Sequence, residues 1–182
     1  MLMTEEHKLT RGLVQVYTGN GKGKTTASLG LVFRALGHGL RIYVMQFMKG
    51  QTVYGELESA KQFSDQLTIE QVGRPQFVKQ GKQTHVDRQL AQEAFARARA
   101  LVSSGNYDLV VLDELNCAVD FDLVELEAVK EMIRSKPEHT ELVITGRNVH
   151  PEIVELADLV TEMREIKHYY NAGQQARVGI ES

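Results

Sequence analysis

Residues 18–26 read TGNGKGKTT and lie between a short apolar run, residues 13–17, and an amphipathic stretch that begins near Lys24. A strand, a glycine-rich turn and then a helix form the context that a phosphate-binding loop requires. The glycines let backbone N–H groups point into the turn, and the start of the helix adds partial positive charge. We therefore expect Lys24 to reach the phosphates and Thr25 to place its hydroxyl on a Mg²⁺ ion.

The loop departs from the usual phosphate-binding pattern at its start. That pattern places a glycine where this chain has Thr18, so the first glycine, Gly19, comes one residue late. A glycine-rich surface turn with solvated lysines is the alternative interpretation. We favour the phosphate site because the glycines, the lysine, the threonine and both flanking elements agree. The loop residues expected at the nucleotide are Gly19, Asn20, Gly21, Lys22, Gly23, Lys24, Thr25 and Thr26.

A pair of acids follows a second apolar run and supplies the other half of such a site. Residues 109–112 are entirely apolar and are followed by Asp113 and Glu114. In open α/β sheets, ligands bind at the carboxyl ends of the strands. Either acid could hold Mg²⁺ directly or through water, although a solvated strand end would read the same way in isolation.

The pattern along the chain indicates an α/β protein with a mostly parallel sheet. Short apolar runs alternate with amphipathic stretches, and no linker or internal repeat interrupts them. We predict one domain over residues 1–182, with a flexible N-terminus over residues 1–11. The expected strands are 13–17, 42–47, 67–72, 109–112, 142–145 and 159–163, the last at an edge. The expected helices are one from about Lys24 to a stop around residues 37–39, then 54–63, 84–104 with a cap formed by Thr84 and Asp87, 123–133 and 151–157.

Composition excludes several classes of protein. The net charge of −3 gives no basic field that could hold a nucleic acid. The single cysteine, Cys117, cannot form an internal disulfide and fits a reducing compartment. No apolar stretch is long enough to span a bilayer, and the first residues lack the apolar core of a secretory signal. We therefore expect a cytoplasmic protein with no membrane and no nucleic-acid partner.

Seven segments together resemble one known family, the ATP:corrinoid adenosyltransferases of the CobA/CobO/BtuR type, which act on cobalamin or cob(I)yrinic acid a,c-diamide. The loop alone is common to many nucleotide-binding proteins, whereas the order and spacing of the set is much more specific. The similarity covers about residues 12 to 181. The matching segments are 19–26, 34–39, 46–50, 112–116, 144–147, 157–163 and the tail positions 167–168, 172–173 and 179–181.

The resemblance implies a RecA-like P-loop fold, in which helices flank the sheet, and a homodimer that uses ATP with Mg²⁺. In such enzymes the Co(I) of a reduced corrinoid attacks the ribose 5′-carbon of ATP, and triphosphate leaves. ATP in this family is turned end for end relative to ordinary P-loop ligands. A cobalt-reducing flavoprotein is a further expected partner.

The residue roles that the resemblance implies are specific. Lys24 and Glu114 are the expected catalytic residues, and Thr25, Glu114 and Asp113 the expected metal contacts. Co(I) is itself a powerful nucleophile, so the protein has to align the attack and stabilise charge on the leaving triphosphate. Lys22 and Arg147 are expected to contribute to that stabilisation.

The corrinoid side departs from the family pattern. Relatives close to the enterobacterial enzyme carry Gly-x-x-Phe-x-Trp after the third strand, where the aromatic residues displace the lower ligand of cobalt. Here the loop reads Gly73-Arg74-Pro75-Gln76-Phe77-Val78-Lys79: Phe77 is the match to the phenylalanine, Lys79 stands at the tryptophan position, and the chain contains no tryptophan. Phe77 is the expected corrinoid contact; a loop residue folded onto the core is the alternative.

Two other functions compete with adenosyl transfer. A RecA-like ATPase or kinase would act at the γ-phosphate, and the pair Asp113–Glu114 resembles the acids that position water in such ATPases. A non-catalytic protein that binds a nucleotide or escorts a corrinoid is the third hypothesis. The products formed from ATP and reduced cobalamin distinguish these hypotheses.

Overall fold

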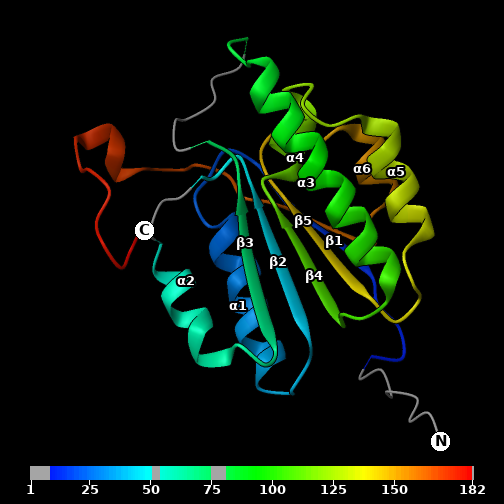
Figure 1. The fold of residues 1–182 in the computed structure, drawn as a ribbon. Helices are drawn as coiled ribbons and strands as arrows, with labels where there is room; N and C mark the ends of the chain where they lie inside the picture. The colour runs from blue at the N-terminus through cyan, green and yellow to red at the C-terminus, as the bar shows by residue number, and fades with distance from the viewer. Residues whose placement is uncertain (1–8, 51–53, 75–80, 182) are drawn as a thin grey trace, which may run out of the picture.

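The structure, a computed structural model, describes residues 9–50, 54–74 and 81–181. One parallel sheet of six strands runs through the middle of the protein in the order β3-β2-β4-β5-β1-β6 (Figure 1). Its strands are β1 (Val14–Thr18), β2 (Ile42–Phe47), β3 (Leu67–Val72), β4 (Leu109–Asp113), β5 (Glu141–Thr145) and β6 (Leu159–Glu162). The predicted α/β class and parallel sheet are confirmed.

Helices cover both faces of this sheet (Figure 1). Helices α1 and α2 lie on one face, and α3, α4, α5 and α6 lie on the other. Their bounds are α1 (Lys24–Leu36), α2 (Gly55–Ala60), α3 (His85–Ser104), α4 (Leu115–Asp120), α5 (Leu126–Ser135) and α6 (Pro151–Leu156), with 3-10 turns at Lys61–Phe63 and Tyr169–Ala172. Within the described residues, no helix has the length and apolar character needed to cross a membrane.

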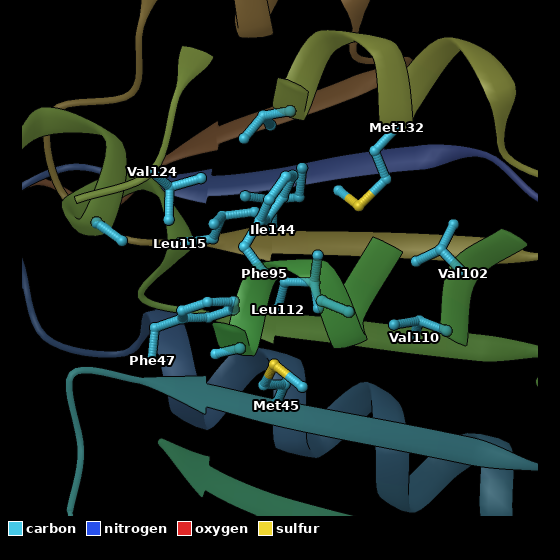
Figure 2. Close-up of a cluster of buried hydrophobic side chains, with 14 of the residues drawn as sticks. Met45, Phe47, Phe95, Val102, Val110, Leu112, Leu115, Val124, Met132 and Ile144 are labelled. Carbon is cyan, nitrogen blue, oxygen red and sulfur yellow. The ribbon is translucent and has the colours of Figure 1, made fainter. Parts of the chain in front are cut away.

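The central strands are held between two apolar cores. Every residue of β2 and β4 is buried, as expected for strands covered on both faces. The larger core, between the sheet and α3 to α6, includes Phe47, Phe95 and Leu112 (Figure 2). Strand β6 is exposed at all its residues and forms one edge of the sheet, as predicted. This packing fixes the carboxyl ends of the central strands relative to one another.

The strand order brings three loops together. Strand β5 lies between β1 and β4 and pairs in parallel with both. Parallel strands end at the same edge of a sheet, so the loops after β1, β4 and β5 share that edge. The glycine-rich loop, the acid pair and residues 145–147 therefore meet there.

One helix was not predicted from the sequence. We expected a helical face to start at Leu123, but α4 precedes it over Leu115–Asp120, and Asp122 separates the two segments with a φ of 53°. A six-residue helix completes less than two turns, too few for a visible apolar period. The helix matters because it begins directly after Glu114, which it fixes at the end of β4.

The predicted cap at the start of α3 is present, and its Asp87 carboxylate also binds Arg74. Thr84 accepts a hydrogen bond from the Asp87 backbone N–H, and the Asp87 carboxylate accepts from the backbone N–H of Thr84 at 2.8 Å, which completes a capping box. Arg74 donates two hydrogen bonds of 2.6 Å to the same carboxylate. These bonds from Arg74 hold the pKa of Asp87 at about 2. The carboxylate thus ties the loop after β3 to the start of α3.

We predict that Asp87→Asn lowers the free energy of unfolding at pH 7 by about 1–3 kcal/mol, because a charge-assisted pair is lost from a buried position. The pKa of Asp87 is lower in the folded than in the unfolded protein, so its stabilisation is complete above pH 4 and disappears as the pH falls toward about 2. Urea denaturation from pH 7 to pH 3 should show the difference between wild type and variant shrinking with acidity. The exposed Asp65→Asn variant is the control, and a pH-independent difference for Asp87→Asn would contradict the prediction.

Candidate functional site

The glycine-rich loop is closed from behind by the chain that follows β6. Gly19 and Gly23 have φ angles of 95° and 123°, which disfavour any residue with a side chain. A Cβ on Gly19 would lie 2.4 Å from the Met163 carbonyl oxygen, and the backbone N–H of Gly21 donates to that oxygen at 2.7 Å. No side chain caps the start of α1. The first-turn N–H groups of this helix are therefore available to an anion.

Lys24 lies inside the loop. Its side chain is buried, and the ammonium donates to the carbonyl oxygens of Gly19 at 2.8 Å and Gly21 at 2.9 Å. Burial lowers the pKa of Lys24, and the negative charge of Glu114 opposes that shift. Both hydrogen-bond partners of the Lys24 ammonium are neutral carbonyl oxygens, so its positive charge remains available to an anion in the cleft.

Asp113 connects the loop to three strands. Its carboxylate is completely buried at the end of β4. One oxygen accepts from the hydroxyls of Thr25 at 2.9 Å and Thr145 at 2.7 Å. The other accepts from Lys49 at 2.8 Å and Gln46 at 3.4 Å. Asp113 therefore links α1, β5 and β2 at the floor of the site.

Glu114 follows in a left-handed conformation with a φ of 62°, and its backbone N–H donates to Thr145 Oγ1 at 3.0 Å. Its carboxylate accepts from the Cys117 thiol at 2.9 Å. Burial, reinforced by the charge of Glu114, raises the pKa of that thiol to about 12. Cys117 is therefore a neutral donor that orients Glu114.

Strained backbone marks the same edge of the sheet. Met48, Glu114 and Asn148 have φ angles of 58°, 62° and 54°, and they follow β2, β4 and β5 respectively. Such angles cost a residue with a side chain about 1–3 kcal/mol and persist where the surroundings enforce them. Strain at the ends of three neighbouring strands indicates a site whose side chains are held in fixed directions.

These residues surround a cleft of about 710 Å³, which is large enough for a nucleotide. Asp113 lies behind Thr25 rather than on the surface of the cleft, and Gly19 contributes its carbonyl to Lys24. Phe77, the expected corrinoid contact, lies outside the described residues. The expected residues that line the cleft are Asn20, Gly21, Lys22, Gly23, Lys24, Thr25, Thr26, Glu114 and Arg147.

Other lining residues were not predicted. Lys49 follows β2, Tyr54 and Glu56 lie at the start of α2, and His168, Ile180 and Glu181 come from the C-terminal tail. Lys49 and the tail belong to segments that carried the family resemblance, which was the available signal. The tail contacts the loop through Glu181, whose carboxylate forms an ion pair with the Lys22 ammonium at an N–O distance of 3.4 Å. The tail therefore lines the cleft beside the glycine-rich loop.

The oxygen groups of the cleft suit a Mg²⁺ ion bound together with a nucleotide. In the described parts of the chain, no cluster of three or more His, Cys, Asp or Glu could hold a metal by itself. Thr25 and Glu114 nevertheless offer a hydroxyl and a carboxylate beside the phosphate loop, and magnesium sites often combine few protein oxygens with substrate phosphates. The residues present fit a metal that enters with the polyphosphate.

Comparisons with known proteins agree with this geometry. Residues 10–182 match the family model of the ATP:corrinoid adenosyltransferases BtuR/CobO/CobP. The chain is 37% identical to a corrinoid adenosyltransferase of Escherichia coli K12 over 171 residues, which are 94% of this chain and 86% of that relative. It is 38% identical to one from Pseudomonas aeruginosa and 36% identical to the corrinoid adenosyltransferase CobA of Salmonella typhimurium; each alignment covers 94% of this chain, and 84% and 86% of the respective relative. The chain with this phosphate loop and acid pair belongs to the ATP:corrinoid adenosyltransferase family.

Proposed function

We propose that this protein transfers the 5′-deoxyadenosyl group of ATP to the Co(I) of a corrinoid and releases triphosphate. One observation carries the proposal: in a member of this family, the glycine-rich loop, Lys24 and Glu114 line a single cleft, and Asp113 holds Thr25 from behind it. The cleft offers positive groups for a polyphosphate and acids for a metal at one end of the nucleotide. That arrangement suits the departure of a triphosphate as a unit.

The reaction balances without an added oxidant or base. Co(I) supplies both electrons of the new cobalt–carbon bond and becomes Co(III), and the electrons of the broken C5′–O bond leave with the triphosphate. The protein must therefore align the cobalt with C5′ and stabilise negative charge on the leaving group. Lys24, the loop N–H groups, Lys22 and Arg147 are the groups of this chain suited to that task.

Thr25 and Glu114 are the residues that we propose to hold Mg²⁺, with Asp113 behind them. When bound, Mg²⁺ would neutralise charge on the phosphates. Asp113 already accepts the hydroxyl hydrogens of Thr25 and Thr145, so its first role is to aim the threonine. The carboxylate of Glu114 is held by the Cys117 thiol and faces the cleft.

The corrinoid side and the partners remain proposals of the same kind. We propose Phe77 as a corrinoid contact, a cobalt-reducing flavoprotein as the source of Co(I), and a homodimer as the assembly. Leu159 and Val160 of the edge strand β6 are 44% and 40% exposed, an apolar surface that a second copy could cover. A reducing, cytoplasmic setting would suit a reaction that starts from Co(I).

The products separate this function from its competitors. With ATP, Mg²⁺ and chemically reduced cobalamin, we expect the absorption spectrum of an adenosylated corrinoid and one inorganic tripolyphosphate per cobalt–carbon bond. Unmodified cobalamin together with accumulating ADP would support a γ-phosphate ATPase or kinase instead. Binding of both ligands with no turnover would support the non-catalytic alternative.

We predict that Lys24→Ala slows adenosyl transfer at least ~100-fold, because the leaving triphosphate loses a preorganised charge. Stopped-flow spectroscopy of the cobalt–carbon bond under saturating ATP gives the rate. Lys61→Ala, which removes an exposed lysine that forms an ion pair with Glu58, is the matched control and should react like wild type. Near-normal transfer by Lys24→Ala would remove this residue from the catalytic set.

We predict that Glu114→Gln raises the Mg²⁺ concentration at half-maximal rate by about 10–100-fold, the usual cost of disturbing a metal site. The substitution keeps the shape of the side chain and removes its charge. A titration of transfer rate against free Mg²⁺ measures the shift, with the exposed Glu58→Gln variant as control. Superimposable titrations for Glu114→Gln and wild type would show that Glu114 does not bind the metal.

A further inference from the structure

Lys49 lies at the point where the nucleotide cleft meets the buried acid. It follows β2 and lines the cleft, while its ammonium is 2.8 Å from Asp113. The Lys49 side chain is 18% exposed, whereas that of Asp113 is 0% exposed. One end of this ion pair is thus accessible from the cleft and the other is sealed from water.

The carboxylate of Asp113 is fully occupied by its neighbours. A carboxylate has about four acceptor positions, and four side chains donate to this one. Among these donors Lys49 alone carries a formal charge. A buried carboxylate without a counter-charge is strongly disfavoured, so Lys49 supplies the neutralising cation at this position. A divalent cation that approaches Asp113 from the cleft has to take the place of Lys49.

The local backbone directs Lys49 to this position. Met48 just before it has a φ of 58°, and a Cβ added to Gly73 would lie 3.1 Å from the Lys49 backbone nitrogen. The ring of Tyr54 lies below the ammonium, with its centroid 5.3 Å away. Burial lowers the pKa of Lys49, but the charge and hydrogen bond of Asp113, together with the charges of Glu56 and Glu114, raise it above its ordinary value. Lys49 therefore remains a cation in the cleft.

We propose that Lys49 is a second phosphate-binding lysine, which neutralises Asp113 in the empty site and is released to the triphosphate when a divalent cation arrives with the nucleotide. The idea rests on the proposed function, since it assumes a polyphosphate in the cleft. It adds a role for a residue that follows β2, a strand separated from β1 by β4 and β5 in the sheet. Lys24 of α1 and Lys49 of the loop after β2 would then hold the polyphosphate from two different segments of the chain.

A purely structural ion pair is the competing explanation, and it predicts different measurements. A structural Lys49 would affect the stability of the fold and leave affinities for cations and phosphates unchanged. Under the proposal, Lys49 competes with the metal for Asp113 in the empty site and binds phosphate in the filled site. Removal of its charge should therefore strengthen metal binding and weaken phosphate binding, two effects of opposite sign.

Two probes test the proposal without any catalytic turnover. Binding of Mn²⁺ alone, followed by electron paramagnetic resonance, should tighten at least ~10-fold in Lys49→Met, because a competing cation is gone. Binding of inorganic tripolyphosphate at saturating Mg²⁺, followed by calorimetry, should weaken at least ~10-fold, because a charge-assisted contact is lost. Lys49→Arg keeps the charge and should change both affinities less. Lys61→Met is the matched surface control and should change neither.

A measurement on the unaltered protein covers the case in which Lys49→Met fails to fold. Amine modification read by peptide mass spectrometry should show that tripolyphosphate with Mg²⁺ protects Lys49 and leaves Lys61 unchanged. Equal modification of Lys49 with and without the ligands would overturn the proposal, as would unchanged affinities in a folded Lys49→Met. If wild type bound tripolyphosphate normally in that case, the proposed function would stand and only the role of Lys49 would fall. Wild type that binds no tripolyphosphate would instead contradict the proposed function itself.

Discussion

The buried carboxylate of Asp113 is the contact on which the site depends. It joins Thr25 of the phosphate loop, Thr145 of β5 and Lys49 after β2, so three strands and one helix are fixed at a single point. Such a group is stable in the interior only while its acceptor positions are filled by donors and its charge is matched. The stability of the fold and the geometry of the nucleotide cleft therefore rest on the same hydrogen bonds.

The strand order explains why these groups can meet. With β5 between β1 and β4, the loop and the acids are separated by one strand, and Thr145 fills the space between them. The apolar cores on both faces hold the strand ends, and the left-handed residues after β2, β4 and β5 turn the chain sharply into the cleft. The packed sheet thus holds the residues with positive φ angles at its carboxyl edge, and such strained residues often occur at functional sites.

Much of the fold could be read from local patterns. Strand β2 has the predicted bounds because it is a run of large apolar residues, and β3 has them because apolar and polar residues alternate along it. Thr84 and Asp87 form the predicted cap. Helix α4 escaped prediction because it is too short to show a helical period. Lys49 and the tail residue Glu181 were not assigned to the site because their proximity to Asp113 and Lys22 depends on how distant segments pack, which spacing does not encode.

The sequence by itself determined the chemistry that is available: a glycine-rich loop with Lys24 and Thr25, an acid pair after an apolar strand, and an ordered set of segments that identifies the family. These features are local, and their meaning follows from residue type and spacing. Only the tertiary structure decided which charges neutralise one another, because the neighbours of a buried group are set by strand order and packing. The saturation of Asp113 by Lys49, Gln46 and two threonines is a property of the assembled sheet, where burial makes each hydrogen bond necessary.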